Sequence, residues 1–137
     1  AQARWRVLDG GHKLDIETRA DYVRATDRST DAPLPRIAPL RLGLSLIHQT
    51  GPWYTRADLT RAQAQNRVAP NELPTDGYTM LNLYLSHRLK TGGPVVWELF
   101  ARGTNLLNVE ARNHVSVLKD IAPMAGRGLL VGVRGTF

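Results

Sequence analysis

The sequence has no cysteine and no long apolar run, and both absences limit what the chain can be. Without cysteine, a disulfide framework and a thiolate metal site are excluded. No stretch of 18 or more apolar residues is present, so the sequence predicts no transmembrane helix. If the chain lies in a membrane, it must belong to a closed barrel, because only helices and closed barrels satisfy their backbone hydrogen bonds in lipid.

A secretory leader and a basic tail are also missing. Ala1–Asp9 carries charged residues where the apolar part of a signal peptide would lie, which predicts a mature fragment, a truncated chain or a protein that is not exported. The net charge is +6, but the arginines are scattered and form no basic run. We therefore expect no nucleic acid among the partners.

Patterns of known catalytic chemistry are absent from the sequence as well. It contains no P-loop, no glycine-rich dinucleotide fingerprint and no Ser-His-Asp motif context. The carboxylates Asp15, Glu17 and Asp21 alternate beside Lys13 and Arg19. An acid–base pair or a cation site would use such residues, but we interpret them as a wall of mixed charges. The sequence predicts neither an enzyme nor a cofactor.

What the sequence does contain is alternation with a period of two, which predicts β-strands. Between residues 13 and 22, Leu14, Ile16 and Tyr22 lie on one face and charged residues lie on the other. The same alternation recurs along the chain, so we expect an all-β fold of antiparallel, up-and-down strands. Seven strands are predicted, at residues 2–9, 12–26, 37–49, 53–65, 77–90, 95–108 and 127–137.

Short and long connections alternate strictly between these strands. The short ones, at Asp9–Gly11, Thr50–Pro52 and Lys90–Pro94, suit tight hairpins, and the long ones span about 27–36, 66–76 and 109–125. Transmembrane barrels show this pattern, with short periplasmic turns and long outer loops. Within the last loop, Val109–Asp120 is expected to form a short helix or to lie over the barrel mouth.

Three segments resemble the end of TonB-dependent receptors. They are Asp76–Leu83, Phe100–Asn108 with its Asn-Leu-Leu-Asn sequence, and Gly126–Phe137 with its terminal aromatic. The resemblance covers about residues 37–137, and Ala111–His114 with Lys119–Pro123 and Gly126–Arg127 is similar to a subgroup that includes zinc-uptake and related receptors. It implies a 22-stranded outer-membrane barrel with an N-terminal plug, energised by TonB, that imports siderophores, cobalamin, haem, metals or sugars.

The chain departs from that family pattern because it carries no TonB box, no plug and too few strands to close such a barrel. We therefore expect residues 1–137 to be the C-terminal part of a receptor barrel, a fragment that is not competent alone. An isolated seven-stranded sheet would leave two edges unpaired. The resemblance implies the TonB complex, the barrel-assembly machinery, outer-membrane lipid and a small nutrient as partners of the full-length parent.

Two kinds of site are predicted. Phe137, with Val133 and Val131 on the same face of the last strand, resembles the signal that the barrel-assembly machinery reads; simple lipid-facing packing is the alternative. His114 is the candidate metal ligand, in an outer loop near Glu110 and Asp120, although an ordinary exposed loop histidine would fit too. No two of the four histidines have the spacing of a local metal site.

Two other functions remain open from the sequence. A different outer-membrane barrel, such as a porin or an autotransporter translocator, would share the strand pattern. A soluble all-β binding module would instead have to bury its leucine faces at 40–46 and 81–89 in a core.

Overall fold

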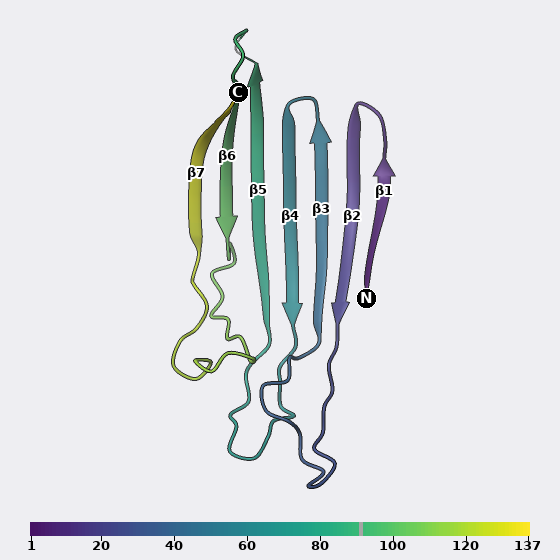
Figure 1. Ribbon diagram of the computed structural model, residues 1–137, viewed down its shortest axis with the longest axis vertical. Helices are drawn as coiled ribbons and strands as arrows, with labels where there is room; N and C mark the ends of the chain where they lie inside the picture. The colour runs from purple at the N-terminus through teal and green to yellow at the C-terminus, as the bar shows by residue number, and fades with distance from the viewer. Residues whose placement is uncertain (91) are drawn as a thin grey trace.

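The computed structural model describes residues 1–90 and 92–137 and forms one antiparallel sheet in which the strands follow chain order (Figure 1). Each strand pairs with its neighbours in the sequence, so the sheet is an up-and-down meander, as predicted. The seven strands are β1 (Gln2–Leu8), β2 (His12–Asp21), β3 (Arg41–Thr50), β4 (Trp53–Ala62), β5 (Tyr78–Lys90), β6 (Val96–Thr104) and β7 (Gly128–Thr136).

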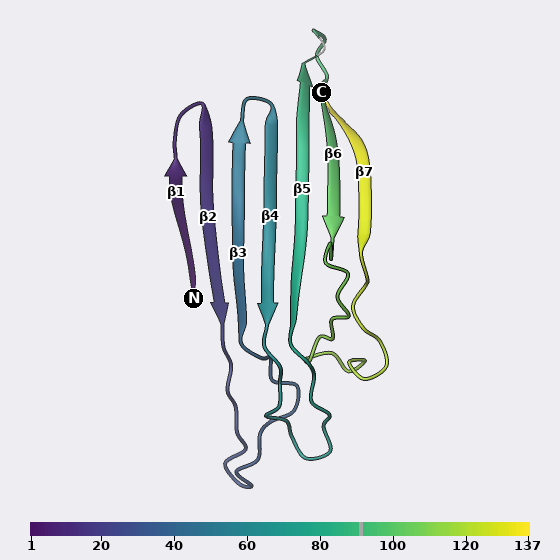
Figure 2. The same cartoon turned by 180° about the vertical axis from the view of Figure 1, so that it is seen from behind.

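The links confirm the predicted alternation of short and long connections. The β1–β2 and β3–β4 turns lie at one end of the sheet, and the three long links lie together at the other (Figures 1 and 2). Gly10 and Gly51 have φ angles of 132° and 50° in those turns, a region that favours glycine. Of the predicted turn at Lys90–Pro94, Thr91 lies outside the described residues.

Several strands are shorter than predicted, because the backbone pairing with the neighbouring strand ends earlier. The β2–β3 ladder ends at the Asp21–Arg41 pair, although strands were expected to continue to residue 26 and to begin at residue 37. β6 ends at Thr104 instead of residue 108, because Asn105 and Asn108 adopt φ angles of 46° and 52°. Residues 109–113 are irregular and residues 114–120 form turns, so the short helix considered there is absent.

The two faces of the sheet differ in chemistry, and few apolar side chains are buried as in a conventional hydrophobic core. Ile47, Ala62 and Ala111 are the only buried hydrophobic residues in the described part of the chain. On one face, apolar side chains stand exposed along every strand except β2, where Leu14 and Ile16 are half-buried; Leu42, Leu46 and Leu99 keep 43–46% of their surface open. The described residues contain no helix long and apolar enough to cross a membrane.

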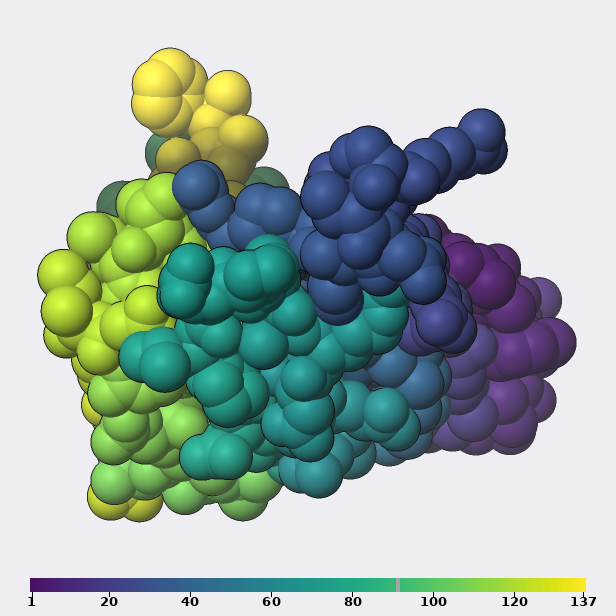
Figure 3. All heavy atoms as spheres, turned by 90° about the horizontal axis from the view of Figure 1, so that it is seen from below, coloured from purple at the N-terminus to yellow at the C-terminus, as the bar shows by residue number. Residues whose placement is uncertain are grey.

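The three long links pack against one another at their end of the sheet. Seen from below, residues 22–40, 63–77 and 105–127 cover this end side by side (Figure 3). Gln65 Nε2 donates to the carbonyl of Ile37, and Arg67 Nη1 donates to the carbonyl of Ala25. Such contacts between different links hold them together as one cluster of loops.

Candidate functional site: the polar face and the loop cluster

The polar face of β1 and β2 carries the first part of an ionic network. The register places Arg6 opposite Asp15 and Arg4 opposite Glu17. Arg6 Nε donates to Asp15 Oδ1 at 2.8 Å, and Arg4 reaches both carboxylates, at 3.1 Å from Glu17 Oε1. Asp15 is only 5% exposed, and its charge is compensated by two arginines whose own side chains are about half exposed.

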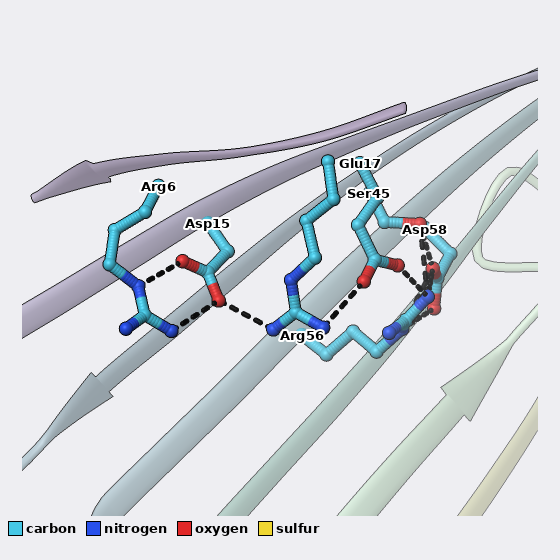
Figure 4. A network of polar contacts seen from close by, with 7 residues as sticks. Arg6, Asp15, Glu17, Ser45, Arg56 and Asp58 are labelled. Atoms are coloured by element: carbon cyan, nitrogen blue, oxygen red, sulfur yellow. Dashed lines mark hydrogen bonds and ion pairs between the residues drawn. The ribbon is translucent and has the colours of Figure 1, made fainter. Parts of the chain in front are cut away.

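The network continues across β3 to β4 (Figure 4). Arg56 Nη2 lies 3.3 Å from Glu17 Oε2, and Arg56 Nε donates to Asp58 Oδ1 at 2.9 Å. The Ser45 hydroxyl donates to Asp58 and accepts from Arg56 at 3.1 Å. These contacts join four strands through charge-assisted hydrogen bonds. They have the form of the mixed-charge wall that the alternating carboxylates predicted.

On β4–β6 the polar face carries a row of aromatic rings instead. The ring centroids of Tyr54 and Tyr84 are 6.0 Å apart, and those of Tyr84 and Phe100 are 6.3 Å apart. The guanidinium of Arg102 lies 5.7 Å from the centroid of Tyr84, and that of Arg134 lies 5.9 Å from the centroid of Phe100. A shallow cavity of about 430 Å³ opens beside this row, lined by Tyr54, Arg56, Asp58, Asn82, Tyr84, Arg102 and Thr104.

The apolar face changes character toward its two ends. At the short-turn end, the His12 and His48 rings stack at 5.8 Å, and the Trp53 and His87 rings lie 4.2 Å apart. At the loop end, Arg61 Nη1 donates to Thr79 Oγ1 at 3.0 Å. Amphipathic side chains therefore border a band of leucines at both ends.

A second polar cluster is buried between the loops. Glu72 accepts hydrogen bonds from the backbone N–H groups of Ala69 and Arg36 and from the Lys119 ammonium at 3.0 Å. Lys119 also donates to the carbonyl of Leu73. Burial opposes the charge of Glu72, but the Ala69 and Arg36 N–H groups and Lys119 outweigh it and lower its pKa to about 2. One carboxylate thus ties all three long loops together.

His114 belongs to this cluster and is buried, at 2% exposure. Its Nδ1 lies 2.9 Å from Thr75 Oγ1, and its Nε2 lies 3.3 Å from Glu72 Oε1 without the alignment of a hydrogen bond. Burial lowers the His114 pKa, and the neighbouring Lys119 lowers it further. We assign a neutral imidazole whose Nδ1 accepts from the Thr75 hydroxyl, because Lys119 Nζ faces the same nitrogen at 3.5 Å.

The reading of His114 as an ordinary exposed histidine is therefore wrong. Its close partners are Glu72, Thr75 and Lys119, and Glu110 pairs with Arg112 instead. Across residues 1–90 and 92–137, no group of three or more His, Cys, Asp or Glu side chains is placed to hold a metal ion. The role of His114 as a metal ligand stays a prediction.

The predicted assembly residues lie at the outer edge of the sheet. Val131 and Val133 point to the apolar face of β7 with 69% and 59% of their surface exposed, and Phe137 follows the strand fully exposed. Their recognition by an assembly machinery stays a prediction. The sequence did not point to the partners of His114, which are Glu72, Thr75 and Lys119. These residues come from two different loops, and no local spacing in the sequence connects them.

Both the sequence and the fold of this chain are similar to those of known proteins. The family model described as "TonB dependent receptor-like, beta-barrel" matches residues 1–106. Among solved structures, the chain is similar to one titled "Copper transporter OprC", with a TM-score of 0.78 and 22% sequence identity. The match covers 96% of this chain and 22% of that chain, so residues 1–137 span about a fifth of the length of the similar structure.

Proposed function

Because the chain belongs to the TonB-dependent receptor-like β-barrel family, we propose that it forms a sector of the barrel wall of an outer-membrane receptor that imports a scarce nutrient. The observation that carries this proposal is the contrast between the two faces of one open sheet. One face is a continuous apolar surface, and the other carries an ionic network that joins β1 to β4.

The dimensions of the sheet support a place in the membrane. β2, β3 and β4 have 10 residues each, and a tilted barrel strand needs about 9–11 residues to cross a bilayer. The band of leucines between the two amphipathic borders would then face lipid. A soluble module would leave this apolar area exposed to water, where it would favour aggregation.

The edges of the sheet support a larger barrel. β1 and β7 each pair with one neighbour among the described strands, and an outer-membrane barrel tolerates no open edge in lipid. Further strands of the parent protein would pair with these edges. We propose that residues 1–137 are the C-terminal part of that barrel, with Phe137, Val133 and Val131 as the signal for its assembly.

Transport itself would belong to the full-length protein, energised by the TonB complex. The proposed substrate class is the one that the family suggests, a siderophore, metal, haem, cobalamin or sugar. A porin has the same kind of wall but needs no TonB. Uptake by the full-length parent that stops when TonB is deleted would separate a receptor from a porin.

The orientation of the faces can be tested at two adjacent residues of β7. Val131 lies on the apolar face and Leu130 on the polar face. In the full-length parent, Val131→Arg should destabilise the folded barrel by roughly 2 kcal/mol, as charges do on a lipid-facing site, whereas Leu130→Arg should have little effect. Unfolding in detergent or lipid measures both. Equal effects, or a larger loss for Leu130→Arg, would reject the proposed placement.

The assembly role has its own test. Deleting Phe137 in the full-length parent should lower the amount of heat-modifiable barrel in the outer membrane, and Phe137→Tyr should restore most of it. An unchanged amount of folded barrel after the deletion would contradict a recognition role for Phe137.

A further inference from the structure

The third long link, residues 105–127, turns a charged residue inward and apolar residues outward. Lys119 is only 4% exposed and lies inside the loop cluster. On the outer side of the same link, Val117, Leu118 and Ile121 keep 70%, 51% and 79% of their surface exposed. A loop that faces water ordinarily shows the reverse arrangement, because burial favours apolar side chains and hydration favours charged ones.

The exposed apolar surface continues along the chain toward β7. Residues 121–125 have the sequence Ile-Ala-Pro-Met-Ala, and all five are exposed. Backbone hydrogen bonds hold them in place, because the N–H of Ile121 donates to the Leu118 carbonyl and that of Met124 donates to the carbonyl of Ala111, which is fully buried. We define the apolar ridge as Val117, Leu118 and residues 121–125.

The ridge lies past the ends of the strands, at the β7 side of the sheet. The third link leaves the sheet after Thr104 and returns to it at Gly128. Figures 1 and 2 place this link below β6 and β7, and Figure 3 shows it at the border of the molecule farthest from β1. The ridge is therefore close to the edge at which β7 has one neighbour among the described strands.

We propose that the apolar ridge docks against the outer link of the parent strand that pairs with β7. The proposal rests on the proposed function, in which further strands of the parent protein cover this edge. A strand paired with β7 would lie about 4.8 Å from it, so the link joined to that strand at this end would emerge beside the ridge. The described links at this end of the sheet are long, so a long link is expected there too.

A segment of the parent fits the ridge better than lipid does. The band of leucines ends at an amphipathic border, where Arg61 Nη1 donates to Thr79 Oγ1, and the ridge lies past the strand ends. Lipid headgroups, and not acyl chains, would lie at that level. A link of the parent is at the β7 edge whenever the barrel closes, and its contact with Val117 and Ile121 would remove apolar area from water.

Docking of the ridge would also hold the loop cluster in place. Lys119 lies between Leu118 and Ile121 in the sequence. A contact that fixes the ridge therefore also fixes the Lys119 ammonium against Glu72 and the Leu73 carbonyl. The closing edge of the barrel would in this way be coupled to the second long link, which joins β4 to β5.

Photocrosslinking in the full-length parent tests the docking. Benzoylphenylalanine replaces Ile121, and a matched variant carries it at Val23, an exposed apolar residue that follows β2 at the same end of the sheet. After irradiation in outer membranes, mass spectrometry identifies the attached peptide. We expect Ile121 to capture a parent segment from outside residues 1–137, in the link joined to the strand that pairs with β7. Val23 should not capture this segment.

A charge placed on the ridge provides the second arm. Ile121→Asp should raise hydrogen exchange at residues 72, 73 and 75 by about tenfold, because a carboxylate in an apolar contact loosens the ridge and Lys119 with it. Val23→Asp, the same change on the first link, should leave exchange at these residues unchanged. Heat-modifiable mobility shows that each variant is folded.

The outcomes separate this inference from the proposed function. In a folded outer-membrane barrel, the docking alone is overturned if Ile121 captures lipid, another protein, a parent segment far from that strand, or nothing. Capture of the same segment from Val23, or unchanged exchange after Ile121→Asp, overturns it too. Failure of the parent to form a membrane barrel would overturn the proposed function itself.

Discussion

The carboxylate of Glu72 and the ammonium of Lys119 lie 3.0 Å apart, although 47 positions separate the two residues in the sequence. Their side chains are only 10% and 5% exposed. Each also makes backbone contacts that the other does not: Glu72 accepts from Arg36 and Ala69, and Lys119 donates to Leu73. This ion pair therefore connects all three long loops through direct contacts.

Replacing Glu72 with Gln should loosen all three loops at once. The change leaves the Lys119 ammonium buried without its counter-charge, which costs about 3 kcal/mol of local stability. Hydrogen exchange should increase at residues 36, 69 and 113–120, while the strands keep their protection. The double variant Glu72→Gln with Lys119→Met should recover part of the loss, and faster exchange in the strands than in the loops would contradict this account.

Acidification should open the loop cluster through His114. Its pKa is lowered in the folded cluster, so an opened cluster, with a pKa near 6.5, binds a proton more readily. The stability of the cluster is therefore complete above pH 6.5 and decreases as the pH falls below that value. Exchange at residues 111–120, corrected for the intrinsic rate, should rise between pH 7.5 and 5.5. His114→Gln should remove this dependence.

Glu72 adds a second loss of stability at lower pH. Its pKa falls from 4.5 to about 2 in the folded cluster, so its contribution is present above pH 4.5 and is lost as the pH falls toward 2. In the His114→Gln variant, the remaining pH dependence of loop exchange should lie below pH 4.5. A transition that stays centred near neutral pH in this variant would show that another group is responsible.

Asp15 and Asp21 provide a matched pair on β2. Both face the polar side of the sheet, but Asp15 binds Arg4 and Arg6, whereas no ion pair of Asp21 occurs in the described part of the chain. Asp15→Asn in the full-length parent should lower the unfolding temperature, because two neighbouring guanidiniums lose their counter-charge. Asp21→Asn should change it little. Similar shifts for both variants would show that the network contributes no specific stability.

Gly132 should not tolerate a larger residue while Phe100 is present. A side chain there would collide with the Phe100 ring, so Gly132→Val should cost about 1–3 kcal/mol and displace Phe100 from Arg134. Adding Phe100→Ala makes room and should recover part of the stability. Thermal unfolding of the single and double variants measures this coupling, and additive effects would argue against direct contact.

The sheet could be predicted from the sequence because its determinants are local. Alternation such as Leu14, Asp15 and Ile16 fixes which face each residue takes, and the glycines of the short turns fix where the chain reverses. The ends of the strands were harder to predict from the sequence. For example, β6 ends at Thr104 because Asn105 and Asn108 adopt positive φ angles. The cluster of Glu72, His114 and Lys119 depends on how loops meet in space, which no periodicity encodes.

Pairing restricted to chain neighbours also determines how an error would spread through this sheet. Each strand takes its register from the one beside it, because no strand pairs with a more distant one within residues 1–90 and 92–137. A slip of one residue in a single hairpin would reverse the faces of that strand. Every later strand aligned on it would be reversed as well, so that Arg102 on β6 and Arg134 on β7 would move to the apolar face. A slip in the last hairpin along the chain would therefore reverse the faces of the fewest strands.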